Sequence, residues 1–189
     1  MNAMRNNLLL LLLLIPLVSF SQTKADSISL TFPKILLINK QQEVLLIFDS
    51  NRKAYEVPSM GLIEGPVSFR NYIDAATQQI DVTYVSYRLA GLFTYLFPDK
   101  YRTFIRPYFV VQATGYSNGL GVPDAAYKWF PLQEALKEIK YPASALIVEK
   151  VLRNPKAVWS AAFEEYGYTN RVEVSKIKFK IVENFTKIN

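Results

Sequence analysis

A glycine loop that leads directly into a short amphipathic helix constrains the fold of this chain more than any other stretch. The loop starts at Gly61, and Ser68 is placed to cap the helix by accepting a hydrogen bond from its first turn. From Phe69 onward, apolar residues recur at offsets of 3, 4, 7 and 11, which is the spacing of one helical face. The pattern predicts a helix to about Ile80 with one apolar face. That face consists of Phe69, Tyr72, Ile73, Ala76 and Ile80.

Three short strand patterns precede this helix. Ile35–Asn39 and Val44–Phe48 are largely apolar runs joined at a polar turn, Lys40-Gln41-Gln42, which is the spacing of a hairpin. Tyr55–Val57 is a third candidate strand and ends before Pro58. This part of the chain therefore predicts one edge of a sheet.

A long hairpin pattern follows the helix. Val82–Phe97 and Tyr101–Ala113 are rich in β-branched and aromatic residues and flank a turn at Pro98–Lys100. The glycines and proline of Thr114–Asp124 predict a loop. The pattern then predicts a strand over Tyr127–Phe130 and helices over Pro131–Ile139 and Pro142–Leu152.

The C-terminal part carries one helix pattern and one strand pattern. Trp159, Phe163 and Tyr166 have helical spacing, so we expect Trp159–Tyr166 to be a helix that docks the tail on the domain. Apolar and lysine residues alternate within Val172–Val182, which predicts a strand with one basic face.

This order of elements predicts a mixed α/β fold of the α+β type, a mixed β-sheet flanked by helices with a C-terminal helix–strand extension. The length suits one domain. We expect a polar leader over residues 22–33, the domain over 34–155, and the extension over 156–189 packing on it.

The N-terminus has the layout of a secretory signal peptide. Arg5 precedes an uninterrupted apolar run at Leu8–Val18, and small residues at Ser19 and Ser21 mark a cleavage site before Gln22. Eleven apolar residues are fewer than the roughly 20 that cross a bilayer. We therefore expect residues 1–21 to be removed, leaving a periplasmic or extracellular protein with no stable membrane anchor. A retained anchor is the alternative.

Two absences limit the chemistry. The sequence contains no His and no Cys, which excludes imidazole and thiolate metal sites, disulfides and thiol nucleophiles. The formal charge of +6 could favour an anionic ligand, but no basic run or nucleic-acid motif accompanies it, so we expect no nucleic-acid partner.

With the loop and helix in this order, the chain resembles a Nudix hydrolase domain over roughly Ile35–Leu152. The hairpin segment Tyr87–Val111 is similar to the hairpin that follows the family's signature box. Lys128–Leu136 is similar to the family's strand-to-helix step. The resemblance implies a diphosphate hydrolase fold in which glutamates of the box helix bind Mg²⁺.

Most residues of that signature box are absent. The box reads glycine, five residues, Glu, seven residues, then Arg-Glu-apolar-any-Glu-Glu-any-Gly. With Gly61 as its first glycine, only Gly61 and the commonly acidic loop position Glu64 match. The remaining box positions fall on Val67, Ala75, Ala76, Gln79, Ile80 and Val82. In this register the former metal face is apolar apart from Gln79, and no shift of register restores three acids.

Two acids remain on the helix, but they cannot share a metal ion. Asp74 and Asp81 lie seven residues apart, which is about 10 Å along a helix. We therefore predict no metal site, and no cofactor unless diphosphate hydrolysis is retained, in which case Mg²⁺ is required.

A few other side chains are candidates for a site. Glu64 is the candidate catalytic residue, as a ligand or base, and an ordinary loop carboxylate is the alternative. Gln79 could offer a neutral carbonyl. Arg52 lies in the turn before the third strand, where it could meet a phosphate. Tyr95, Arg106 and Tyr108 lie on the hairpin and could line a groove for an aromatic or anionic ligand, or simply pack in the sheet.

The sequence thus predicts an exported Nudix-fold protein without metal-dependent diphosphate hydrolysis, acting as a binding or interaction module. Its partner would be a small anionic or aromatic ligand, or a protein of the cell envelope. One alternative is a divergent hydrolase for a nucleoside-diphosphate-like substrate, with carboxylates from outside the helix such as Glu64 with Asp49 or Glu56. Another is a structural role in an envelope assembly, through the C-terminal strand.

Overall fold

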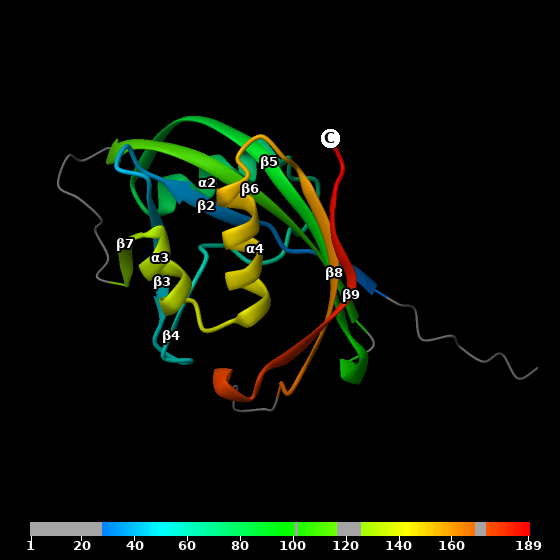
Figure 1. The fold of residues 1–189 in the computed structure, drawn as a ribbon. Coiled ribbons are helices and arrows are strands. Elements are labelled where there is room, and N and C mark those ends of the chain that lie inside the picture. Colours follow the sequence, from blue (N-terminus) through cyan, green and yellow to red (C-terminus); the bar gives the residue numbers. More distant parts are fainter. Residues whose placement is uncertain (1–27, 101, 117–125, 169–172) are drawn as a thin grey trace, which may run out of the picture.

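The computed structural model describes residues 28–100, 102–116, 126–168 and 173–189, and one mixed sheet draws strands from all four segments (Figure 1). The predicted signal peptide lies outside the described residues. Within the described part, no helix is long and apolar enough to cross a membrane. The strands are β1 (Ile28–Thr31), β2 (Lys34–Ile38), β3 (Glu43–Asp49), β4 (Ala54–Glu56), β5 (Val82–Phe97), β6 (Arg102–Tyr116), β7 (Tyr127–Pro131), β8 (Trp159–Tyr166) and β9 (Lys178–Lys187).

The sheet runs in the order β4-β3-β2-β6-β5-β8-β9, with β1 beside β6 and β7 beside β3. The predicted long hairpin is confirmed as β5 and β6, joined by a short 3₁₀ turn at Pro98–Lys100. Strand β2 pairs parallel to β6, and β8 pairs parallel to β5, whereas β9 pairs antiparallel to β8 and ends the sheet.

Helices cover both faces of the sheet, as predicted. Helix α2 (Phe69–Gln79) packs on one face, and α3 (Leu132–Glu138) and α4 (Pro142–Arg153) pack on the other. In Figure 1, α3 and α4 lie in front of the sheet and α2 lies behind it. Strand β2 is buried on both faces because Ile35 and Leu37 face α2 while Leu36 and Ile38 face the other helices.

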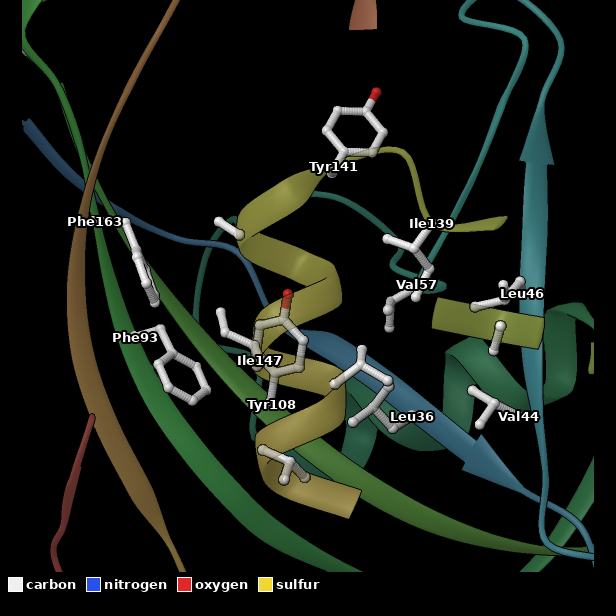
Figure 2. Close-up of a cluster of buried hydrophobic side chains, with 14 of the residues drawn as sticks. Leu36, Val44, Leu46, Val57, Phe93, Tyr108, Ile139, Tyr141, Ile147 and Phe163 are labelled. Atoms are coloured by element: carbon white, nitrogen blue, oxygen red, sulfur yellow. The ribbon is translucent and has the colours of Figure 1, made fainter. Parts of the chain in front are cut away.

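The larger core cluster lies between the sheet and α4. Phe93 of β5, Tyr108 of β6 and Phe163 of β8 are fully buried and surround Ile147 of α4 (Figure 2). Burying a side chain of this size contributes roughly 1.5–3 kcal/mol. This cluster therefore binds α4 and the C-terminal strands into one body with the hairpin.

The glycine loop and its helix form as predicted. The Ser68 hydroxyl accepts a hydrogen bond from the Asn71 amide at 3.1 Å, which caps α2. One turn later, the Tyr72 hydroxyl accepts from the Met60 amide at 2.8 Å and donates to the Gly61 carbonyl at 3.1 Å. The side chain of Tyr72 therefore fixes the glycine loop against the helix.

The predicted helix at Trp159–Tyr166 is wrong, because this segment is strand β8. Its backbone pairs with β5 on one side and β9 on the other, while Ala161, Phe163 and Glu165 alternate inward and are buried. Helix propensities differ by less than about 1 kcal/mol per residue between ordinary side chains. The stabilisation from strand pairing on both edges and from the burial of Phe163 is larger than this difference in helix propensity.

Three boundaries also differ from the prediction. Ile28–Thr31 forms β1 beside β6, so the sheet begins inside the predicted leader. Gly115 and Tyr116 extend β6 into the predicted loop, whose residues 117–125 lie outside the described part. The last strand starts at Lys178, after a 3₁₀ turn at Val174–Lys176, and continues to Lys187.

Candidate functional site

A pocket of about 260 Å³ lies between the turn of the β5–β6 hairpin and the start of α4. We refer to it as the cationic pocket. Five of its side chains are cationic, five are aromatic, and one is a carboxylate. The lining residues are Phe32, Lys34, Arg52, Glu56, Phe97, Lys100, Arg102, Phe104, Arg106, Tyr141 and Tyr168.

The two-residue period of β6 supplies one wall of this pocket. Arg102, Phe104 and Arg106 point to the same face as the buried Tyr108, because alternate residues of a strand share a face. Lys34 is the parallel neighbour of Tyr108 at the start of β2. A basic and aromatic wall therefore continues directly from the hydrophobic core.

Arg106 lies flat over an aromatic ring in this wall. Its guanidinium carbon is 3.9 Å from the ring centroid of Tyr95, and Phe32 and Phe104 lie within 6 Å of it on other sides. The Nε of Arg106 is buried and has no hydrogen-bond partner among the described residues. An unpaired buried donor is costly, so this group favours an acceptor that enters the pocket.

Lys34 and Glu56 form a buried pair at the base of the pocket. The Lys34 ammonium donates to the Val57 carbonyl at 3.1 Å and lies 3.8 Å from the Glu56 Oε1. Burial lowers the pKa of Lys34 to about 8, and the nearby Glu56 carboxylate only partly opposes this effect. The other oxygen of Glu56 accepts from the Ser144 hydroxyl at 3.3 Å, which in turn accepts from Tyr108 at 3.4 Å.

Arg52 reaches the pocket from the turn between β3 and β4. Its Nη1 donates to the Tyr141 hydroxyl at 3.0 Å, and its Nε lies 3.6 Å from the Asp49 carboxylate. Tyr141 is the N-cap residue that precedes α4, and Figure 2 shows its hydroxyl directed away from the core cluster. The Arg52 side chain remains partly exposed and available to a ligand.

A second buried carboxylate, Glu165, lies near the Arg106 side of the pocket. It is 2% exposed and accepts from the Tyr168 hydroxyl at 2.6 Å. Burial raises the pKa of Glu165, while nearby Arg106 and the hydrogen bond from Tyr168 oppose the increase. Lys100 covers the other side of the Tyr168 ring at 5.3 Å. Tyr168, two residues beyond the end of β8, thus lines the pocket, and Glu165 of β8 accepts its hydrogen bond from outside the lining.

The structure brings together some of the predicted ligand residues. Arg52 and Arg106 both line the cationic pocket, whereas Tyr95 and Tyr108 are fully buried behind it. Tyr95 supports Arg106, and Tyr108 ends the hydrogen-bond chain to Glu56.

The sequence prediction missed most of the pocket. The alternate arginines at positions 102 and 106 of a predicted strand were a usable signal, since strand periodicity places them on one face. No local pattern singles out Lys34, Lys100, Tyr141 or Tyr168, because they come from distant segments.

Glu64 and Gln79 lie apart from this pocket. Glu64 is exposed and lines a separate hollow beside the glycine loop, together with Met60 and Ala75. Gln79 is exposed at the end of α2, beside a crevice of only about 10 Å³.

The backbone at the end of α2 is consistent with a second register for the C-terminal half of the signature box, one residue earlier. Asp81 follows the helix with φ of 55°, the left-handed conformation in which a helix-ending glycine belongs, whereas Val82 already pairs in β5. The last three glutamate positions of the box then fall on Ala75, Gln78 and Gln79. These residues are exposed or half-buried, so the positions are neutral and face solvent rather than forming an apolar face.

The residues present do not fit the Mg²⁺ site that the resemblance implies. An alanine and two amides supply no carboxylate, and Mg²⁺ prefers anionic oxygen ligands. The nearest helical acid, Asp74, accepts a hydrogen bond from the Tyr84 hydroxyl at 2.5 Å. In the described part of the chain, no three acidic residues come close enough together to hold a metal ion. Glu64, Asp49 and Glu56 therefore do not form such a group.

The fold is similar to that of solved Nudix proteins. No protein-family model and no curated protein matches the sequence. A mutator MutT protein from Bacillus halodurans aligns with 84% of this chain and 97% of its own, with a TM-score of 0.60 and 17% identity. The E. coli ORF135 protein aligns with 69% of this chain and 93% of its own, with a TM-score of 0.53 and 16% identity.

A NUDIX hydrolase from Nitrosomonas europaea aligns with 67% of this chain and 90% of its own, with a TM-score of 0.50 and 14% identity. The described chain therefore has a Nudix fold. At these identities the likeness establishes the fold alone.

Proposed function

We propose that this protein is an exported Nudix-fold binding protein that captures a small anionic ligand with a planar apolar part. The observation that supports this function is the cationic pocket, where five cationic side chains outnumber one carboxylate and aromatic rings form the remaining walls. The ligand's anionic group would lie against the arginines, and its planar part against the rings.

The charge of the pocket favours an anion over a neutral ligand. Lys34 and Arg106 are packed into the protein, where charges interact more strongly than in bulk water. Arginine binds phosphate and carboxylate through two parallel N–H groups, which fixes the orientation of the ligand. The Arg106 side chain lines the pocket, so its guanidinium could donate to such a group.

We also propose that the protein does not carry out metal-dependent diphosphate hydrolysis. The support is the chemistry of α2, where neither register places a carboxylate at the ligand positions: they are Ala76, Gln79 and Ile80 in one and Ala75, Gln78 and Gln79 in the other. The apolar run at Leu8–Val18 and the cleavage site before Gln22 support export. The ligand would then be a molecule present outside the cytoplasm.

Calorimetry with pyridoxine 5′-phosphate tests the binding function. This probe joins one phosphate group to a planar ring, as the pocket requires. We expect saturable 1:1 binding that weakens as salt increases, and much weaker binding of pyridoxine, which lacks the phosphate. Arg102→Met combined with Arg106→Met should abolish binding, whereas Arg153→Met, outside the pocket, should not. If the Arg102→Met/Arg106→Met double variant bound the probe as well as the Arg153→Met control does, the assignment of the site would be refuted.

A turnover assay tests the loss of hydrolysis. The mature protein from Gln22 onward is incubated with Mg²⁺ or Mn²⁺ and a panel of nucleoside diphosphate derivatives, and released phosphate products are followed. We expect no metal-dependent turnover. Turnover that Glu64→Gln abolishes and Gln79→Ala leaves intact would instead support the divergent hydrolase.

A further inference from the structure

One cation of the pocket, Lys34, differs from the others in its environment. It is 6% exposed, and its ammonium lies beside the Val57 carbonyl and 3.8 Å from the Glu56 carboxylate. Three guanidinium groups, of Arg52, Arg102 and Arg106, line the same pocket. A primary amine thus lies where an anionic ligand would be held, with a proton acceptor next to it.

This environment favours the neutral amine. Burial, with smaller contributions from Arg106 and Arg52, lowers the pKa of Lys34 to about 8, while Glu56 and Glu165 partly oppose the decrease. At pH 7.5 about a quarter of Lys34 would be neutral, compared with about one in a thousand for an ordinary exposed lysine. Only the neutral amine has the lone pair that attacks a carbonyl carbon, so Lys34 is a far better nucleophile than a typical surface lysine.

We propose that Lys34 forms a reversible imine with an aldehyde or ketone that carries a phosphate or carboxylate group. This inference rests on the proposed function, since the arginines of the pocket must first hold the anionic group. The ligand class is therefore narrower than that of a simple anion, and the protein would retain such a carbonyl compound covalently.

The step balances without an oxidant, a reductant or a metal. The Nζ lone pair attacks the carbonyl carbon, and Glu56 transfers one proton from the nitrogen to the former carbonyl oxygen, which gives a neutral carbinolamine. Glu56 then transfers the second proton from the nitrogen to the hydroxyl group, which leaves as water as the C=N bond forms. Glu56 is the carboxylate in position for both transfers, because its Oε1 lies 3.8 Å from Nζ.

A matched pair of probes separates this inference from the proposed function. Pyridoxal 5′-phosphate carries the aldehyde, and pyridoxine 5′-phosphate has an alcohol in its place. The mature protein is incubated with limiting pyridoxal 5′-phosphate, reduced with borohydride to fix any imine as a secondary amine, and mapped by peptide mass spectrometry. We expect Lys34 to be labelled at least tenfold faster than Lys100, which also lines the pocket but is exposed.

Excess pyridoxine 5′-phosphate should suppress the labelling of Lys34 and leave that of Lys137, an exposed lysine outside the pocket, largely unchanged. Lys34→Arg, which keeps the charge, should bind the alcohol probe but yield no imine. Glu56→Gln, compared with wild type at equal occupancy of the pocket by the aldehyde probe, should slow the labelling of Lys34. The wild-type map alone is decisive, so the test does not depend on the folding of a variant.

The outcomes are distinct. Binding of pyridoxine 5′-phosphate with labelling spread evenly over surface lysines would overturn the imine and leave the binding function intact. Absence of binding by the alcohol probe, with no selective labelling by the aldehyde, would overturn both.

Discussion

The buried Lys34 should make the protein more stable as the pH rises from about 8 to about 10.5. Its pKa is about 8 in the folded protein and 10.5 when unperturbed. Between these values the unfolded chain binds more protons than the folded protein does, so the free energy of unfolding increases with pH. Below pH 8 both states are protonated, and the cost of burying the charge is present in full.

The size of the effect follows from the same two pKa values. A difference of one pKa unit corresponds to about 1.4 kcal/mol. Over the whole pH range in which Lys34 titrates, the free energy of unfolding should therefore increase by about 3 kcal/mol. About 2 to 3 kcal/mol of this should appear between pH 7 and pH 10. That is a large share of the ~5–15 kcal/mol that stabilises a typical domain.

Urea unfolding at several pH values between about 7 and 10 measures this effect. The comparison is between wild type and Lys34→Met, because the contributions of other titrating groups cancel in the difference. Wild type should gain stability relative to the variant as the pH rises. Lys100→Met, at an exposed position of the same pocket, should follow the wild-type curve.

Parallel curves for wild type and Lys34→Met would refute the reasoning, because they would show that Lys34 titrates at the same pH in the folded and unfolded chains. Lys34→Arg is a second reference that stays charged throughout this range. It should also lack the rise.

Three further changes have defined outcomes. Arg106→Met removes a charge-assisted hydrogen bond worth about 1.5–3 kcal/mol, and calorimetry should show pyridoxine 5′-phosphate binding about 10- to 100-fold more weakly. Phe163→Ala removes a fully buried ring between β8 and α4 and should cost about 3–5 kcal/mol in urea unfolding. Gly167→Ala places a Cβ 2.2 Å from the Lys176 carbonyl oxygen at a φ of 90°, so its melting temperature should fall by several degrees, at about 2–4 °C per kcal/mol.

Each of these changes has a matched control. Arg153→Met removes an arginine that pairs with Glu149 outside the pocket, so binding should be unchanged. Phe48→Ala, at a ring that is 37% exposed, should cost less than half as much as the loss of Phe163. Gly65→Ala shares the positive φ but meets nothing within 4 Å, so the difference from Gly167→Ala isolates the clash. Equal effects within any pair would contradict the packing described for that site.

Part of this structure was predictable because its determinants are local. The cap at Ser68, the stripe that follows it and the β5–β6 hairpin are encoded by residues close together in sequence. The mixed sheet with helices on both faces follows from their order. In contrast, the second register of the signature box needed the backbone conformation of Asp81, since no acidic residue was present to mark it.

The sequence alone thus determined the Nudix-type order of elements and the absence of carboxylates at the box positions of α2, because periodicity and side-chain chemistry are properties of short segments. Tertiary structure decided that Trp159–Tyr166 is a strand, because the open edge of β5 and the partner β9 are far away in sequence. Tertiary structure also decided which residues come together to form the cationic pocket. Lys34 acquires its lowered pKa only when distant residues remove it from water, which no local pattern can report.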